Sequence, residues 1–365
     1  MKNICLWTLV LMLPVCAFAN DGKTTDGTHA TTEENREGIL TEVEESAAAS
    51  SEEINYAPKI HGTIRGKFEY QPEEDEIRFQ VRSARVSFEG NVAKGASYKA
   101  EIDLSDEGSI KMLDAYVRLT PYRNFDFTIG QMRVPFTTDA HRSPHKQYFA
   151  NRSFIAKQVG NVRDVGATLG YSFGKKVPVT LQAGLFNGSG LTEQKNYWTS
   201  SINYSAKAEI GLPAGFTAQL SVQKTHPDIV DIHMYDASLS FKSGRWMIEA
   251  EYLSKNYENN SFDSVNAFDG FVCYDIPLKK VFTKISLLAR YDMMDDHSDG
   301  EADEDGVLPI DDYARKRITG GVTLSIAKPF TADIRINYED YFYRDSGIPA
   351  TSEKDKFVIE LMVRF

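Results

Sequence analysis

From Ile60 to the C-terminal residue Phe365, apolar and polar residues alternate with a period of two in one segment after another. The last segment, FVIELMVRF over 357–365, is a clear case. A period of two is produced by a β-strand, because successive side chains point to opposite faces of the sheet. Charged residues recur on one face of these segments and the other face stays apolar. The sequence therefore predicts an all-β fold.

The lengths of the connections distinguish a barrel from a sandwich. Sixteen segments are expected as strands, near 60–70, 77–90, 97–104, 111–119, 125–134, 164–173, 178–186, 201–210, 216–223, 235–242, 245–253, 267–275, 281–291, 314–326, 332–342 and 357–365. From the fifth strand onward, tight turns such as 174–177 alternate with long loops such as 135–163. Short turns on one rim, long loops on the other and an even strand number are typical of outer-membrane barrels. We therefore predict a transmembrane antiparallel β-barrel over 58–365, with short periplasmic turns and long extracellular loops.

The N-terminal region carries the features of an exported protein. Residues 1–19 have a charged start at Lys2, an apolar run and the small-residue site Ala17-Phe18-Ala19, which together predict a signal peptide. Residues 20–57 are acidic, rich in Thr, Ser and Ala, and poor in aromatic residues, so we expect a disordered or partly helical linker. Cleavage after the signal would leave Cys273 as the one cysteine, which excludes an intramolecular disulfide. The expected location is the outer membrane, in contact with its lipid and lipopolysaccharide.

The longest connection is a basic segment in an acidic chain, whose net charge is -11. It also contains several aromatic residues, so it has enough apolar surface to pack. Loops of this length in compact proteins are usually functional or disordered. We expect it to fold into the lumen as a constriction that presents cations to anions; the alternative is a surface loop with solvated charges. The candidate residues on it are Arg142, Lys146, Arg152, Lys157 and Arg163.

A second set of arginines is expected on the barrel wall. Arg78, Arg82 and Arg85 do not share one parity on their strand, and a β-bulge near Ser83 would turn all three inward. With Arg118 and Arg133, they would form a cationic ladder, because guanidinium groups match carboxylate and phosphate oxygens and stay charged. The alternative is that these arginines pair with the carboxylates Glu101, Asp103 and Asp114 on neighbouring strands.

Other kinds of site are poorly supported. His141 and His145 flank a segment containing Pro144, which is expected to exclude a helix, and they have no evident third metal ligand. The acidic segment 295–306 departs from the spacing of a calcium-binding loop. No nucleophile motif, phosphate-binding glycine loop, cysteine pair or nucleic-acid module occurs. We therefore expect no enzyme activity, cofactor, metal or nucleic-acid partner.

Five short motifs resemble the phosphate-selective porin O/P family. They are RSARVSFEG at 82–90, DAYV at 114–117, GQMRVPF at 130–136, RDVG at 163–166 and LFNGSG at 185–190. The resemblance extends more weakly over 60–365, and it implies a sixteen-stranded trimeric channel with its third loop folded inward. The chain departs from the family in lacking a dense lysine cluster.

These observations predict an outer-membrane porin for passive diffusion of small hydrophilic solutes, with a preference for phosphate-like anions. Its partners would be such solutes and two further copies of the chain. One alternative is a non-specific or cation-tolerant channel, because the acidic loop 292–313 would attract cations. Another is a structural or adhesive barrel with a plugged lumen.

Overall fold

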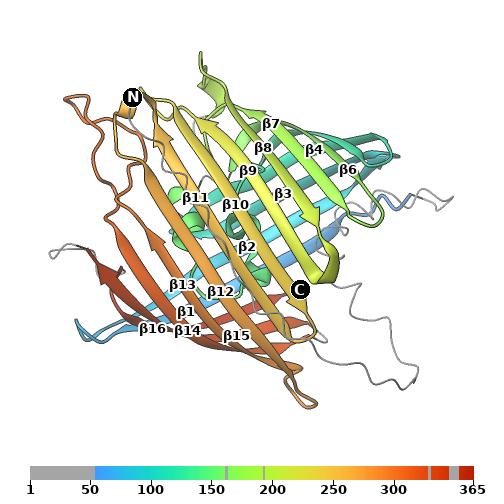
Figure 1. The fold of residues 1–365 in the computed structure, drawn as a ribbon. Coiled ribbons are helices and arrows are strands. Elements are labelled where there is room, and N and C mark those ends of the chain that lie inside the picture. Colours follow the sequence, from blue (N-terminus) through green and yellow to red (C-terminus); the bar gives the residue numbers. More distant parts are fainter. Residues whose placement is uncertain (1–53, 161–162, 192–193, 328–329, 345–352) are drawn as a thin grey trace, which may run out of the picture.

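The computed structural model describes residues 54–160, 163–191, 194–327, 330–344 and 353–365. Within them, sixteen strands follow one another around a single closed antiparallel barrel, and β1 pairs with β16 (Figure 1). The strands are β1 (Lys59–Gln71), β2 (Glu76–Ala93), β3 (Ala96–Asp106), β4 (Ser109–Tyr122), β5 (Phe125–Arg133), β6 (Arg163–Phe173), β7 (Val179–Phe186), β8 (Asn203–Gly211), β9 (Phe216–Thr225), β10 (Ile232–Ser243), β11 (Trp246–Tyr257), β12 (Val265–Pro277), β13 (Lys284–Met294), β14 (Arg315–Ile326), β15 (Thr331–Tyr343) and β16 (Lys356–Arg364).

The sixteen strands confirm the predicted fold, and their bounds differ from the predicted ones by a few residues. The predicted signal peptide and nearly all of the linker lie outside the described residues. The short connections share a rim with the start of β1 and the end of β16. On the opposite rim the first two connections, 72–75 and 107–108, are also short, and the third, 134–162, is the longest in the barrel.

The burial of the strands is inverted relative to that of a soluble protein. In β1 the side chains of Thr63, Arg65 and Lys67 are buried, whereas Ile60 and Ile64 are 58% and 51% exposed. The apolar face therefore points outward and the charged face points into the barrel. Hydrocarbon outside and polar groups inside is the arrangement that a membrane barrel requires.

Six one-turn helices lie in the described parts of the connections: η1 (Asp139–His141), η2 (Pro144–Lys146), η3 (Ile155–Val159), η4 (Gln194–Asn196), η5 (Pro213–Gly215) and η6 (Glu258–Asn260). No helix of the described segments combines the length and the apolar character that crossing a membrane takes. The expectation that Pro144 excludes a helix was wrong. Pro144 occupies the first position of η2, where the missing N–H would have no partner in any case.

The main hydrophobic core lies inside the barrel. It joins residues of the third connection, including Phe136, Phe154 and Ile155, to inward side chains near one end of β10–β13, such as Ile232 and Leu253. All five of these side chains are buried almost completely. This connection is therefore packed against one wall of the barrel.

Candidate functional site: the lumen and its inward loop

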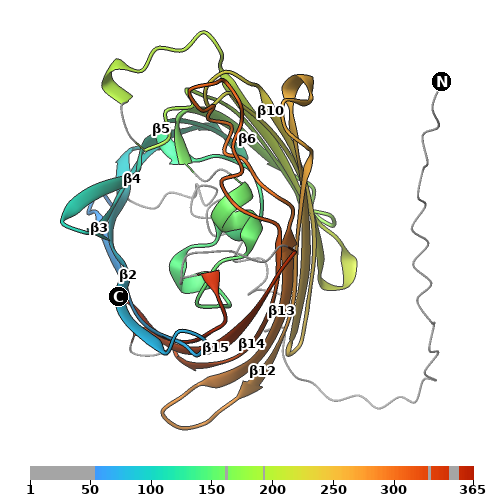
Figure 2. The same ribbon diagram turned by 90° about the vertical axis from the view of Figure 1, so that its left-hand side faces the viewer.

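The third connection folds into the lumen, as predicted, and we call residues 134–160 the inward loop. Figure 2, which looks into the barrel, shows its short helices surrounded by the ring of strands. Its first part is held by wall side chains of β8 and β9. Ser205 Oγ donates to the Pro135 carbonyl at 2.7 Å, Lys207 Nζ donates to the Thr137 carbonyl at 3.2 Å, and the Thr137 N–H donates to Ser221 Oγ at 3.2 Å. The loop is thus fixed by its backbone.

Carboxylates of β11 and β13 hold the loop's N–H groups and its arginine. Glu251 accepts hydrogen bonds from the backbone N–H groups of Thr138 and Asp139, at the start of η1. Glu249 forms an ion pair with Arg142. Asp292 Oδ2 accepts from the Phe154 N–H at 3.1 Å. Because hydrogen bonds to a carboxylate are stronger than neutral ones, these contacts contribute substantially to the position of the loop.

Arginines of β1, β14 and β15 hold the loop's carbonyl groups. Arg317 donates to the Arg152 carbonyl at 2.7 Å, and Arg65 donates to the Ala150 carbonyl at 2.8 Å. Arg335 donates to the Pro144 carbonyl at 3.3 Å. Arg65 and Arg335 share the carboxylate Glu360, which supplies their counter-charge. These arginines are therefore part of the wall that carries the loop.

The lumen has two chemically different sides. The inward side chains of β10–β15, which we call the anchored side, are buried beneath the loop; Arg317 is 2% exposed and Asp292 is fully buried. On β2–β5, whose inward side chains we call the passage side, the arginines keep contact with solvent. There Arg82 is exposed and Arg85 and Arg118 are half-buried.

The arginines of the passage side lie over buried carboxylates. Arg85 Nε donates to Asp103 Oδ2 at 3.0 Å, and its guanidinium lies 3.4 Å from Glu101. Both carboxylates are buried. Arg118 Nε donates to Thr128 Oγ1 at 3.2 Å and its guanidinium stacks over the Tyr116 ring. Arg85 therefore supplies the counter-charge of two buried carboxylates and still keeps part of its surface accessible.

The predicted bulge on β2 is present. Arg65 pairs with Ser83 and Gly66 pairs with Val81, so Arg82 is the extra residue between two partners in register. Arg82 repels both Arg65 and Lys67, whose side chains face the lumen. The bulge therefore brings Arg82 to the lumen side. The predicted alternative, pairing with neighbouring carboxylates, also holds for Arg85.

The nine predicted residues fall into three environments. Arg82, Arg85, Arg118 and Arg133 lie on the passage side, and Arg133 donates to the His141 carbonyl of the loop. Arg142, Arg152, Lys157 and Arg163 are engaged within the protein. Lys146, on η2, is exposed.

The engaged residues have well-defined partners. Arg142 pairs with Glu249 and lies over the Tyr148 ring, 5.2 Å from its centroid. Arg152 donates to the carbonyls of Asp139 and Arg142, although part of its surface stays accessible. Lys157 pairs with Glu353. Arg163 Nε donates to Asp114 Oδ1 at 2.7 Å.

Sequence reasoning missed the wall arginines that carry the loop. Arg65, Arg317 and Arg335 each sit at a polar position of an alternating strand, so the pattern placed them in the lumen. It contained no signal for their contact with the loop, because that contact depends on where a distant segment lies.

A sequence model of the family described as phosphate-selective porin O and P matches residues 59–244, just over half of the chain. The chain belongs to this family. The porin has no match among curated proteins.

Solved outer-membrane proteins share the fold of this porin. An anion-selective porin from Comamonas acidovorans has a TM-score of 0.59 at 10% identity, covering 84% of this chain and 98% of that one. The outer membrane channel DcaP of Acinetobacter baumannii has a TM-score of 0.56 at 14% identity, covering 84% and 97%. OmpT of Vibrio cholerae, in a trimer form, has a TM-score of 0.55 at 13% identity, covering 85% and 99%. At such low identity these proteins establish the fold alone, a closed antiparallel barrel of the outer-membrane porin type.

Proposed function

We propose that this porin passes small hydrophilic solutes by passive diffusion and prefers anions, including phosphate-like ones. The observation that carries the proposal is the segregation of charge across the lumen. The carboxylates of the anchored side are covered by the inward loop, whereas the arginines of the passage side retain contact with solvent. We therefore expect anions to pass along these arginines.

The residues proposed to meet the anion are Arg82, Arg85, Arg118 and Arg133 on the wall, with Lys146 and the accessible part of Arg152 on the loop. Several cations in succession would let an anion enter and leave again, because each binds it weakly. Arg142, Lys157 and Arg163 pair with carboxylates that join the loop to the wall or one strand to another, so we assign them to fixing the loop and the wall.

The family name and the anion selectivity of the Comamonas porin support an anion preference. The trimer form of OmpT supports a homotrimer. We also propose that residues 1–19 direct export and that the barrel surface contacts lipid and lipopolysaccharide.

The experiment that tests the proposal is the reversal potential of single channels of the purified porin in a planar bilayer under a KCl gradient. Stepwise conductance with chloride more permeant than potassium is the expected result. Potassium selectivity would instead support the cation-tolerant alternative, which is favoured by the exposed carboxylates Asp303, Glu304 and Asp305 on an outer loop.

A folded barrel without conductance would support the structural alternative. That alternative is favoured by the hydrophobic core inside the barrel, which fills part of the lumen. If the channel prefers chloride to potassium, phosphate flux into proteoliposomes, measured next to chloride flux, would identify the preferred anion.

A further inference from the structure

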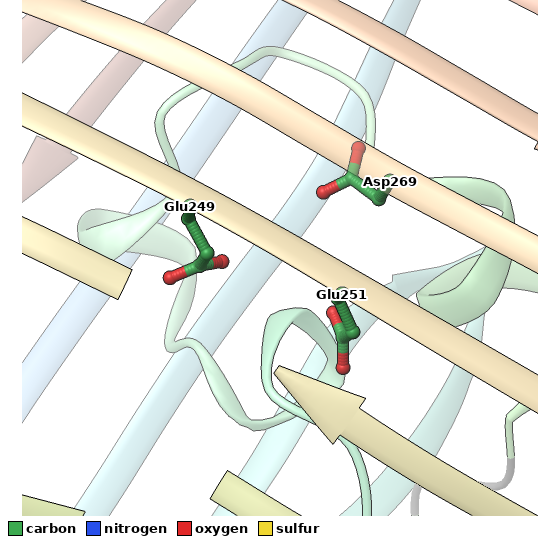
Figure 3. Close-up of side chains that lie close together, drawn as sticks. All are labelled: Glu249, Glu251 and Asp269. Carbon is green, nitrogen blue, oxygen red and sulfur yellow. The ribbon is translucent and has the colours of Figure 1, made fainter. Parts of the chain in front are cut away.

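Three carboxylates of the anchored side converge on one point. Glu249 and Glu251 lie on β11 and Asp269 lies on β12, directly opposite Glu251 in the strand register (Figure 3). One oxygen atom from each carboxylate lies within 4.8 Å of the other two. The convergence follows from the strand pattern, because residues two apart on a strand share a face and meet the paired residue of the neighbouring strand.

The three side chains are almost completely shielded from solvent. Glu249, Glu251 and Asp269 are 3%, 1% and 2% exposed, beneath the part of the inward loop that contains η1. Removing a carboxylate from water is costly unless an opposite charge and hydrogen bonds compensate for it. Three such groups at this separation also repel one another strongly.

The cations near this cluster compensate for its charge only in part. Arg142 is shared between Glu249 and Asp139. Arg290 lies 3.8 Å from both Asp269 and Asp292, too far for a hydrogen bond to either. Glu251 accepts hydrogen bonds from two backbone N–H groups and also has a side-chain hydrogen bond with the neighbouring carboxyl of Asp236.

Oxygen atoms at the cluster have no hydrogen-bond donor in the described residues. They are Glu249 Oε1 and Asp269 Oδ1, and Oδ2 of the nearby Asp236, whose carboxyl interacts with Glu251. Asp236 lies outside the cluster itself and is 4% exposed. A buried carboxylate oxygen without a donor is rare and calls for an unseen partner. Carboxylate oxygens that lie this close together can be bridged only by a proton or a cation, since each of them is an acceptor.

We propose that Glu249, Glu251 and Asp269 bind a divalent metal ion, calcium, beneath the inward loop. Calcium bonds to oxygen are about 2.3–2.6 Å long, so one ion can reach oxygens that are up to about 5 Å apart. The donor set contains oxygen alone, which favours a hard cation over zinc or copper. Calcium suits this set better than magnesium, because it tolerates irregular ligand positions whereas magnesium demands a near-ideal octahedron.

The ion would act as a clamp on the inward loop. It would neutralise the repulsion among the three carboxylates while leaving Glu251 bonded to η1 and Glu249 paired with Arg142. Its effect is on loop position and barrel stability, so the inference does not depend on the ion preference of the channel.

The test is a metal analysis of the full-length porin, folded in detergent with calcium and then passed through calcium-free buffer. We expect about one calcium per chain by mass spectrometry of the metal. The double variant Glu251→Gln/Asp269→Asn should lose this calcium. The control Asp303→Asn/Asp305→Asn, on an exposed outer loop, should retain it.

Thermal unfolding covers the case in which the double variant does not fold. Calcium should raise the unfolding temperature of the wild-type porin by a few degrees, and magnesium at equal concentration should raise it less. Absence of both bound calcium and this shift would overturn the proposal and leave protons as the compensating charge. Calcium lost in the outer-loop variant but kept in the double variant would overturn it as well.

Discussion

Arg82 and Arg142 carry the same charge in opposite environments. Arg82 is the extra residue of a bulge and is exposed, whereas Arg142 is paired with Glu249 and packed on Tyr148. A guanidinium that already has a carboxylate partner offers little to a passing anion. Selectivity is therefore expected chiefly from the exposed Arg82 on the passage side, and mechanical support from arginines that are paired as Arg142 is.

Neutralising Arg82 should weaken anion preference without affecting folding. In the variant Arg82→Gln we expect the anion-to-cation permeability ratio to fall about threefold, roughly 0.7 kcal/mol, because one accessible charge leaves the passage. Reversal potentials under a KCl gradient measure this ratio. Lys316→Gln is the matched control, since Lys316 lies at an outward position of β14. An equal fall of the permeability ratio in both variants would show that the ratio depends on net charge and not on the position of the charge.

The loop histidine His145 should not act as a pH switch in the physiological range. Burial lowers the pKa of His145, and Arg364 and Lys146 lower it further, to about 3. The neutral ring accepts a hydrogen bond from Arg364 Nη1 at 2.6 Å. The contribution of the neutral ring to the free energy of unfolding is fully present above about pH 6.5 and is lost as the pH falls toward 3.

We therefore expect His145 to add no positive charge to the lumen between pH 7.5 and about 5. The measurement is the permeability ratio across that range, in the wild type and in His145→Asn. A change of the permeability ratio near pH 6 that is absent in His145→Asn would contradict the conclusion that the His145 ring is neutral.

The inward loop contains only one-turn helices, and its position depends on the wall. Its N–H groups bind wall carboxylates, its carbonyls bind wall arginines and lysine, and its aromatic residues fill the space over β10–β13. This explains why its basic and aromatic composition predicted an inward position. The individual partners could not be predicted, because they come from strands far away in the chain.

Removing one of these contacts between the wall and the inward loop should make the loop more mobile. Arg142→Gln leaves Glu249 buried without its counter-charge, which we expect to cost about 3 kcal/mol of stability. The variant should unfold at a lower temperature and show larger, noisier single-channel currents. Lys146→Gln, an exposed neighbour on η2, should do neither; identical behaviour of the two variants would contradict the assigned role of Arg142.

At the scale of the whole molecule, the barrel closes where its first and last strands, β1 and β16, meet. Gly62 and Phe365 exchange backbone hydrogen bonds of 2.9 and 3.1 Å. The Phe365 ring covers Gly62 so closely that a Cβ atom there would lie 2.2 Å from a ring carbon. The aromatic side chain of Phe365 thus needs a glycine opposite it.

Filling that position should impair closure. Gly62→Val should reduce the yield of folded barrel, measured as the fraction that resists unfolding in detergent at room temperature, because the ring has to move away from β1. Gly66→Val lies on the same strand face, where an added Cβ meets nothing within 4 Å, and should fold normally. Equal folding yields would show that closure tolerates displacement of Phe365.

The extent of successful prediction follows from the periodicity of the chain. Strand number, barrel class and inward loop could be read from alternation and loop length, because both are local properties of the sequence. The division of the lumen into anchored and passage sides could not be read, and neither could the meeting of Glu249, Glu251 and Asp269, since strand register decides these. Arg82 was predicted in part, because the interrupted alternation on its strand predicted a bulge but not the exposure of its side chain.

The central claim is that solutes move along the passage side, and thiol modification of open channels tests it most directly. Arg82→Cys and Thr319→Cys, on the passage and anchored sides, would each be made in a Cys273→Ser background, which removes the buried native thiol. A negatively charged thiosulfonate reagent should reduce anion current in Arg82→Cys and leave Thr319→Cys unchanged. Modification that reduces the current at Thr319→Cys but not at Arg82→Cys would contradict the claim.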